Sequence, residues 1–461
     1  MATTTKEMTE GAPLPIILNF TFPLLLGNIL QQTYSLVDAA IVGKFLGIND
    51  LAAIGASTSV VFLILGFCNG CCCGFGIPVA QKFGARDYKT MRRYVTVSLQ
   101  LAALMSIVIA VLTSVYCADI LRSMQTPENI FHGAYYYLLV TFIGVPCTFF
   151  YNLLSSIIRA LGDSKTPFWF LLFSTVLNIV LDLFCILVLG WGVLGAGIAT
   201  VVSQGVSALL CYFYMYKHFP VLKGTADDRK FRFPLAKNLL YIGVPMGLQF
   251  SITAIGSVIL QVAVNSLGSL SVAAVTAASK VLNFLACPFD ALGSTMATYG
   301  AQNVGASRYD RLNKGIYSAS LMGFGYSLLA FGVAWFFGRS LTGLFVSGGS
   351  SAQLVELAQT YMITNVLAYP LLTLVNVVRF MIQGMGFSMF AILAGVMEMA
   401  ARSLAGMFLV PALGYFGAAL GSPLAWVAAD LFLVPAYFRC RRVLMSQSHH
   451  LHVMGESAES N

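Results

Sequence analysis

The sequence predicts an all-α, polytopic membrane protein with twelve transmembrane helices in two pseudo-symmetric six-helix bundles. Three observations lead to this fold class. Of the 461 residues, 58% are hydrophobic and only 10% are charged, whereas about a quarter of the residues in a soluble domain are charged. Apolar stretches of about 20 residues, which is the length needed to cross a bilayer, recur along the whole chain. Finally, the second half of the chain repeats the first.

Each of the apolar stretches is predicted to form one membrane-spanning helix. In chain order they cover residues 16–42, 52–79, 94–117, 135–158, 167–189, 193–216, 239–265, 272–300, 316–338, 361–383, 388–411 and 415–438. The mean hydropathy of the chain, +0.81, is consistent with so many spans.

The internal repeat is visible in short motifs at a nearly constant offset of 221 to 224 residues. AQKFGARDY (80–88) returns as AQNVGASRY (301–309), IIRALGDS (157–164) corresponds to MIQGMGFS (381–388), and GAGIAT (195–200) corresponds to GAALGS (417–422). Because each half has an even number of helices, both halves enter the membrane in the same orientation. Parallel repeats of this kind are a transporter architecture, although a duplication that only enlarged a scaffold remains an alternative.

The predicted domains follow from the spans. They are a cytoplasmic tail (1–14), an N-lobe with helices 1–6 (15–216), a cytoplasmic linker (217–238), a C-lobe with helices 7–12 (239–438) and a cytoplasmic tail (439–461). Most of the 26 Lys and Arg residues fall on one side of the membrane in this topology. Basic loops mark the cytoplasmic side, so both termini are expected in the cytoplasm. A contact with lipid headgroups is the minor alternative for the basic clusters.

The net charge and the N-terminal sequence exclude two further interpretations. The net charge of +8 does not indicate nucleic acid, because the basic residues follow the membrane topology. The polar N-terminus and the long first apolar stretch argue against a cleavable signal peptide. We expect a multi-pass membrane protein with no catalytic motif in its spans.

The second span contains a stretch rich in cysteine and glycine. FCNGCCCGFG (67–76) lies in the second span, where small residues let helices approach closely. It lacks a partner segment for a zinc site.

Pro23 and Pro245 lie in the first span of each half, and Pro146 and Pro370 in the fourth. Proline frees a backbone carbonyl and permits a kink. Pro23 is therefore a candidate hinge, with a fixed kink as the alternative.

An acidic site is predicted in the first half alone. Asp38 lies in an otherwise apolar span, and a carboxylate at membrane depth costs about 2.5–3.5 kcal/mol. Asn178 and Asp182 are four residues apart and share a helix face, and Thr200 is expected at a similar depth. These oxygen donors suit a proton or a hard cation. The alternative is a pair of structural carboxyl groups held by hydrogen bonds.

The second half has no such site at the aligned positions. Asp38 aligns near Leu260, Asn178 with Arg402, and Asp182 with Gly406. Glu398 and Arg402 are four residues apart in a span, and we expect a structural ion pair, with a contact to substrate as the alternative. The other basic residue that we assign to a span is Lys280. Lys280, Asp290 and Asp430 carry no assigned role.

The sequence resembles the multidrug and toxic compound extrusion (MATE) family of the MOP superfamily, over about residues 10 to 445. The resemblance is carried by LLLGNILQQTYSLVDAAIVGKFLG, AQKFGARDY, IIRALGDSKTP and GVLGAGIAT. It implies a twelve-helix exporter that works by alternating access. It also implies a cation or proton coupling site at Asp38, Asn178, Asp182 and Thr200, with Tyr137 nearby, and cavity positions at Gln31, Tyr34 and Asn152.

The chain departs from some family members in segments 7 and 10. Those members use carboxylates there, whereas this chain has no acid in either segment. Segment 7 offers Gln249, Ser251 and Thr253, and segment 10 offers Thr373 and Asn376. The departure makes a second cation site in the C-lobe doubtful. It is similar to the pattern of the bacterial DinF-like branch.

The predicted function is secondary active efflux of organic cations or amphipathic drugs in exchange for H⁺ or Na⁺. No cofactor is expected, and no metal other than a possible Na⁺ at the four coupling residues. The expected partners are a small-molecule substrate and membrane lipid, with no nucleic acid, and we expect a monomer. The alternative is a lipid-linked saccharide flippase of the same superfamily, but a cavity for pyrophosphate should be lined with Arg and Lys.

Overall fold

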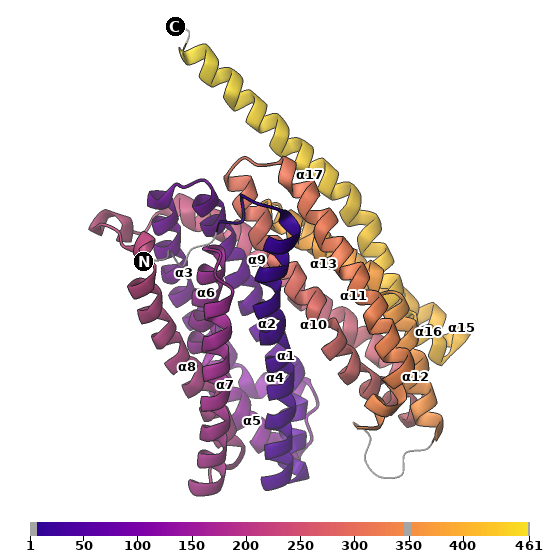
Figure 1. Cartoon of the computed structure of the whole chain (residues 1–461). Helices are drawn as coiled ribbons and strands as arrows, with labels where there is room; N and C mark the ends of the chain where they lie inside the picture. The colour runs from indigo at the N-terminus through magenta and orange to yellow at the C-terminus, as the bar shows by residue number, and fades with distance from the viewer. Residues whose placement is uncertain (1–6, 345–351, 460–461) are drawn as a thin grey trace. The chain divides into compact units, whose positions relative to one another are not determined.

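The computed structural model describes residues 7–344 and 352–459, and the regular elements in these ranges are helices (Figure 1). In the first half they are α1 (Pro13–Phe45), α2 (Ile48–Gly84), α3 (Tyr88–Val115), α4 (Cys117–Ser123), α5 (Glu128–Ile143), α6 (Val145–Ala160), α7 (Lys165–Leu183), η1 (Phe184–Val188) and α8 (Gly192–His218). The linker contains η2 (Pro220–Leu222) and η3 (Ala226–Arg229).

The elements of the second half broadly follow those of the first, but a counterpart of α4 is not among the described residues, and two short helices precede the last one. The elements are α9 (Phe233–Asn265), α10 (Ser269–Gly305), α11 (Asp310–Gly343), α12 (Ala352–Leu367), α13 (Tyr369–Gly384), α14 (Ser388–Leu404), η4 (Ala405–Leu409), α15 (Val410–Leu413), α16 (Tyr415–Ala419) and α17 (Gly421–Glu459). The last helix continues well beyond the predicted end of the twelfth span at residue 438.

The spans match the sequence prediction. Ten helices in the described residues are long and apolar enough to cross a membrane, and two bent pairs raise the number to twelve. The bent pairs are α5 with α6 (47°) and α12 with α13 (48°). Pro146 and Pro370 lie at the starts of α6 and α13. Both prolines therefore explain a break in the fourth span, because proline cannot donate the helical hydrogen bond.

The duplication extends to the backbone geometry. The first span of each half has 33 residues and the second has 37. Each half has one short π-helical segment, η1 or η4. Gly47 and Gly268 begin the second spans with φ of 97° and 98°, and Arg86 and Ser307 follow them with φ of 57° and 55°. A positive φ is uncommon outside glycine, so its recurrence supports a true structural repeat.

The chain forms two compact units, which we call unit 1 and unit 2. Unit 1 comprises Met1–Glu7 and Leu26–Ser251, and unit 2 comprises Met8–Leu25 and Ile252–Asn461. Unit 1 thus contains most of the predicted N-lobe and unit 2 most of the predicted C-lobe. The first part of α1 belongs to unit 2, and the first part of α9 belongs to unit 1. Each of these long helices therefore changes unit along its length.

The repeated loop motif holds the start of the chain in unit 2. Gln302, in the AQNVG sequence, accepts a hydrogen bond from the backbone nitrogen of Met8 (2.8 Å). The Arg311 guanidinium donates to Asn303 (2.9 Å) and to the carbonyl of Gly11 (2.8 Å). Met8 is also part of the unit 2 core. The motif in the second half thus has an anchoring role.

In unit 1 the linker is held in a comparable way. The Asp228 carboxylate in η3 accepts hydrogen bonds from Arg92 and Arg93 in α3, both at 3.2 Å. Burial raises the pKa of this carboxyl, but the hydrogen bonds from Arg92 and the Thr225 backbone and the nearby positive charge outweigh burial and hold the pKa below its ordinary value of 3.8. A charged Asp228 therefore stabilises the docked linker.

The cysteine- and glycine-rich stretch of α2 packs against α9 within unit 1. A Cβ atom at Gly70 would lie 2.6 Å from the Met246 carbonyl oxygen, and one at Gly74 would overlap Gly243. Cys68, Cys71 and Cys72 are buried and free in the same stretch. Small side chains allow this close helix contact, as the sequence analysis expected.

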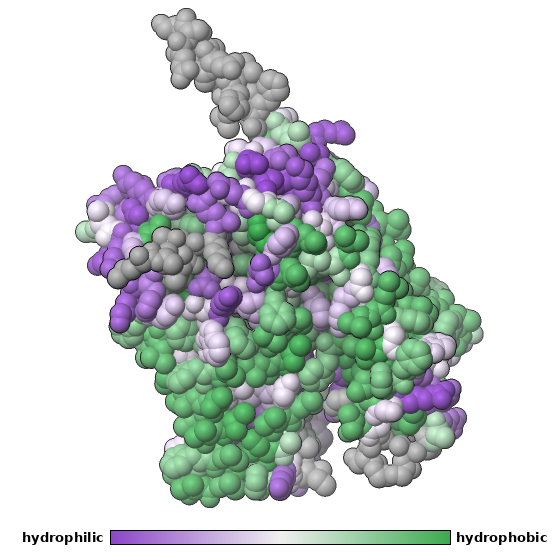
Figure 2. Space-filling model, viewed as in Figure 1, coloured by the Kyte–Doolittle hydropathy of each residue, from purple (hydrophilic) through white to green (hydrophobic). Residues whose placement is uncertain are grey.

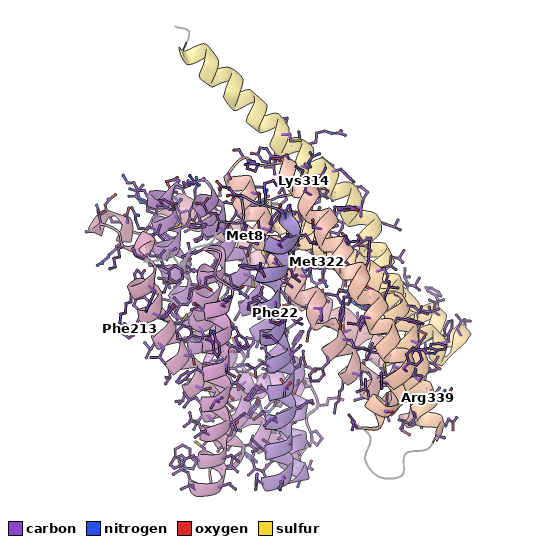
Figure 3. The ribbon with its side chains drawn as sticks, in the orientation of Figure 1. Met8, Phe22, Phe213, Lys314, Met322 and Arg339 are labelled. Carbon is purple, nitrogen blue, oxygen red and sulfur yellow. The ribbon has the colours of Figure 1, made fainter. Side chains whose placement is uncertain are left out.

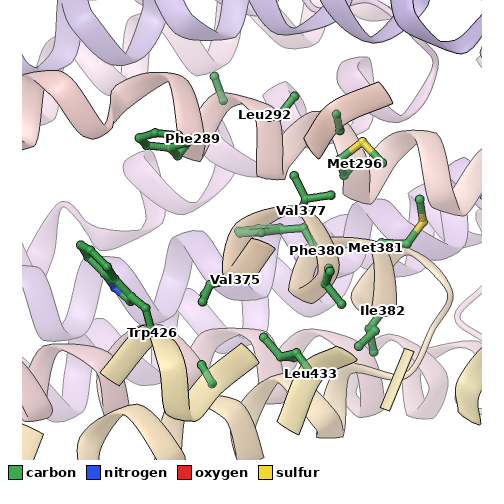
Figure 4. Close-up of a cluster of buried hydrophobic side chains, with 14 of the residues drawn as sticks. Phe289, Leu292, Met296, Val375, Val377, Phe380, Met381, Ile382, Trp426 and Leu433 are labelled. Carbon is green, nitrogen blue, oxygen red and sulfur yellow. The ribbon is translucent and has the colours of Figure 1, made fainter. Parts of the chain in front are cut away.

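The unit 2 core lies between α10, α13 and α17 and includes the first part of α1. Figure 4 shows Phe289, Leu292 and Met296 of α10 with side chains of α13 and α17 around them. On the outside of each unit, hydrophobic side chains cover most of the helix surface, and hydrophilic side chains gather near helix ends (Figure 2). Lys314 and Arg339 mark opposite ends of α11 (Figure 3), as a membrane-spanning helix requires.

Candidate functional site

The four predicted coupling residues lie together in unit 1, on three helices. Asp38 lies on α1, Asn178 and Asp182 on α7, and Thr200 on α8. Asp182 is fully buried and Asn178 is 3% exposed. The i, i+4 spacing of Asn178 and Asp182 places both on the face of α7 that packs against α8. We call these four residues the carboxylate cluster.

The two carboxyl groups of the cluster are neighbours. Asp38 and Asp182 lie close enough to interact electrostatically with each other. The Oδ1 atoms of both are buried and receive no hydrogen bond from the described residues. Two carboxylates this close do not both ionise without a compensating positive charge. The pair can therefore hold a shared proton or a cation, and either one would satisfy the open oxygens.

The Asn178 amide connects the carboxylates to α8. In one orientation its oxygen accepts from the Tyr34 hydroxyl (2.7 Å), and its nitrogen donates to Thr200 (3.1 Å) and Ser203 (3.2 Å). In the other orientation the nitrogen donates to Asp182 Oδ2 (2.7 Å), and the oxygen accepts from the two hydroxyl groups. The second orientation also satisfies the Asp182 carboxylate, so Asn178 links Asp182 to Thr200 and Ser203 on α8.

Two tyrosines complete the surroundings. Tyr34, one helical turn before Asp38 on α1, and Tyr137 on α5 both interact electrostatically with the two carboxylates. The resemblance gave Tyr34 only a cavity role, whereas its hydroxyl bonds directly to the cluster. Ser203 was missed by the sequence analysis. It lies three residues after Thr200, on the same helix face, so the spacing could have identified it.

Gln31 and Asn152 are not joined to the cluster. Gln31 is exposed on α1, and Asn152 is half-buried on α6. Neither side chain makes a hydrogen bond to the cluster within residues 7–344 and 352–459. Pro23 is buried inside α1, three residues before the helix passes from unit 2 to unit 1.

The MatE family model matches residues 23–184 and 245–402, which are one segment in each half. The chain belongs to the MatE family. The two matched segments agree with the internal repeat, and membership of this family makes the chain a transporter and not an enzyme.

Curated relatives include two proteins of Bacillus subtilis (strain 168). The chain is 32% identical to the probable multidrug resistance protein YoeA over 305 residues, which are 64% of this chain and 65% of YoeA. It therefore spans slightly less than two thirds of that relative. It is 30% identical to the probable multidrug resistance protein YpnP over 341 residues, which are 74% of this chain and 76% of YpnP.

Solved structures share the fold at lower identity. A crystal structure of MATE in complex with MaL6 superposes with a TM-score of 0.88 at 22% identity, and covers 95% of this chain and 98% of that one. A multidrug resistance MATE family transporter of the MOP superfamily in an outward-facing conformation gives 0.87 at 22% identity, with the same coverage. These similarities confirm the predicted fold class.

In the C-terminal half of this MatE protein, the predicted ion pair has a third member. Arg402 Nη2 lies 3.3 Å from Glu398 Oε2. The guanidinium of Arg379, on α13, donates to the other oxygen of Glu398. All three side chains are at least 94% buried. The sequence analysis was wrong to assign only Lys280 and Arg402 to the spans, because Arg379 lies inside the predicted stretch 361–383.

The three residues without an assigned role lie in different environments. Asp430, on α17, is 7% exposed and interacts electrostatically with Arg379. Lys280 and Asp290, on α10, have exposed side chains.

Unit 2 also contains a cavity of about 320 Å³ between α9, α10, α12, α13, α14 and α17. Among the described residues that line it, Arg402 is the only charged one. The other lining side chains are aromatic, aliphatic, amide or hydroxyl groups. The cavity lies at the lower end of the usual volume range of ligand sites, about 300–1,000 Å³.

Proposed function

We propose that this MatE protein is a secondary active exporter that exchanges organic cations or other amphipathic compounds for H⁺ or Na⁺ by alternating access. The coupling site is the carboxylate cluster of Asp38, Asn178, Asp182 and Thr200. The observation that carries the proposal is the pair of neighbouring acids, Asp38 and Asp182, each with a buried oxygen that lacks a protein donor.

The cluster holds the coupling ion through its oxygen atoms. Within this proposal, one proton bridges Asp38 and Asp182 throughout the cycle, and the exchanged ion is a second H⁺ on the pair, or Na⁺ bound by the carboxyl groups with the amide and hydroxyl oxygens of Asn178 and Thr200. Oxygen donors suit hard cations such as Na⁺, and no imidazole lies in the cluster. The Asn178 nitrogen donates to Asp182 and its oxygen accepts from Thr200 and Ser203, which fixes the amide beside the carboxyl pair.

The change in charge at Asp38 acts on the bend of α1. Asp38 follows Pro23 by fifteen residues on that helix, and the helix changes unit shortly after the proline. Proline leaves the Asn19 carbonyl without its helical donor, so α1 is easiest to bend there. Loading of Asp38 therefore shifts the bend at Pro23 and drives the exchange between inward and outward access. No cofactor takes part, and the protein acts as a monomer.

Several facts support this function over the flippase alternative. The names of YoeA and YpnP refer to multidrug resistance. The cluster of unit 1 is acidic, which is the wrong charge for a pyrophosphate-linked lipid. We also propose a place in the DinF-like branch, because segments 7 and 10 lack acids. The location that we propose is the bacterial inner membrane, with both termini in the cytoplasm.

Export from cells or vesicles tests the proposal. Asp38→Asn should abolish the efflux of a cationic dye such as ethidium, while the protein is still inserted at the wild-type level. Asp119→Asn is the matched control, because Asp119 is an exposed acid of unit 1 that pairs only with Arg122 among the described contacts. If cells with Asp38→Asn export ethidium as fast as the wild type, the coupling role is wrong.

A further inference from the structure

The unit 2 cavity occupies the position that the carboxylate cluster occupies in unit 1. When the two halves are aligned at the offset of the repeat, four residues that line the cavity align with three members of the carboxylate cluster and with Tyr137. Leu260 corresponds to Asp38, Arg402 to Asn178, Ser422 to Thr200 and Tyr361 to Tyr137. The same location in the two repeats has therefore changed from two acids to one guanidinium.

Two further replacements at this location leave glycine in unit 2. Tyr34, whose ring reaches Asn178 in unit 1, corresponds to Gly256 in unit 2, and Asp182 corresponds to Gly406. A Cβ atom at Gly256 would lie only 3.5 Å from Arg402 Nη1. A larger side chain on α9 would therefore cover this guanidinium, whereas glycine leaves its surroundings open.

Arg402 has an unused donor at this cavity. Its Nη2 is paired with Glu398, but its Nη1 is buried and has no hydrogen-bond partner among the described residues. The whole side chain is 6% exposed. A buried donor without a partner is costly, and more so when it is charged. An acceptor in the cavity would remove that cost.

The local charges also favour an anion. Glu398 is shared between the guanidinium groups of Arg379 and Arg402. Asp430 lies beside Arg379 and does not line the cavity. Asp290 on α10 is exposed and does not line it either. Arg402 is therefore the charged group that faces the cavity, and the other described residues that line it are uncharged.

The rest of the wall defines the body of the ligand. Tyr361, Tyr369 and Trp426 provide aromatic surfaces, and Asn283 and Asn365 provide amides. Such walls suit a flat aromatic group, and the volume suits a small bicyclic ring system. We propose that this cavity binds an aromatic monoanion whose carboxylate accepts a hydrogen bond from Arg402 Nη1.

Binding of three matched compounds to the purified full chain in lipid nanodiscs tests the proposal. The probes are 1-naphthylacetate, its neutral amide 1-naphthylacetamide and the cation 2-(1-naphthyl)ethylamine, measured at pH 7 by equilibrium dialysis with empty nanodiscs as background. Because a hydrogen bond to a charged group is strong, we expect the carboxylate to bind about tenfold or more tightly than the amide. Equal or weaker binding of the carboxylate would overturn the proposal without any variant.

Two variants then identify the contact. Arg402→Gln should remove the preference for the carboxylate over the amide. Arg379→Gln is the matched control, because it removes the same charge from the same partner, Glu398, but does not line the cavity. We expect it to keep most of the preference. If both variants lose it equally, the direct contact with Arg402 is wrong, and if neither loses it, the site lies elsewhere.

This binding experiment needs no ion gradient and does not involve the carboxylate cluster. Its outcome therefore does not depend on whether Asp38 couples ions to transport.

Discussion

The coupling stoichiometry of the carboxylate cluster is our most detailed prediction. Asp38 and Asp182 are neighbours, and no basic side chain is among the described residues that contact them. The dianion is strongly disfavoured in such a site, so one proton or cation is always retained. The charge of the pair then alternates between −1 and 0. Each transport cycle should therefore exchange one H⁺ or one Na⁺.

The number of ions exchanged per cycle determines the largest dye concentration ratio that a given ion gradient can maintain. One pH unit corresponds to about 1.4 kcal/mol, which is a tenfold concentration ratio. Exchange of one proton for one monovalent dye cation moves no net charge, so the membrane potential should not contribute. Exchange of two protons would instead give about a hundredfold ratio per pH unit. It would also respond to voltage by about 2.3 kcal/mol per 100 mV.

The assay uses proteoliposomes loaded with ethidium, in which the pH gradient, the sodium gradient and the potential are imposed separately. We expect the steady-state dye ratio to change about tenfold per pH unit, or about tenfold per tenfold sodium gradient. It should not change when the potential is clamped at different values. Asp38→Asn should abolish uphill transport, and Asp119→Asn should not. A ratio that follows the potential, or a hundredfold change per pH unit, would refute the single exchangeable charge.

Three further predictions follow from other parts of the structure. Pro23→Ala should slow ethidium export severalfold at normal expression, because it restores a helical hydrogen bond at the proposed hinge; wild-type export would exclude the hinge. Glu398→Gln should lower the apparent free energy of unfolding in denaturant by about 3–5 kcal/mol, because it removes the carboxylate that two buried guanidinium groups share. A loss within experimental error would contradict the buried triad. The pKa of Asp228 is lowered in the folded protein, so its stabilising effect is present above pH 3.8 and is lost as the pH falls below that value. In the wild type, the protection of linker amides from hydrogen exchange should fall as the pH drops below 3.8. In Asp228→Asn the protection should show no drop in this pH range.

Much of the fold was predictable because its determinants are local in sequence. A span needs about 20 apolar residues, and hydropathy measures this directly. Pro146 and Pro370 predicted kinks in the fourth spans, and the helices break there by 47° and 48°. The constant offset of the motifs predicted two equivalent halves. Each of these signals depends on residues close together in the chain or on a comparison of the chain with itself.

The site was predictable only in part. The i, i+4 spacing of Asn178 and Asp182 predicted a shared face, and the structure has both on the buried side of α7. The hydrogen bond from Tyr34 to Asn178 joins residues 144 positions apart, and no periodicity reports such a contact. Arg379 was overlooked although hydropathy placed it in a span, because its partner Glu398 is on another helix.

The sequence by itself determined the membrane class, the duplication and the confinement of the acidic pair to one half, because these are properties of composition and order. Only the tertiary structure decided which side chains meet. It brought α1, α7 and α8 together around two carboxylates, it placed parts of α1 and α9 in different units, and it left a cavity beside Arg402. The physical reason is that hydrogen bonds and cavities depend on distances of a few ångströms between helices that are far apart in the chain.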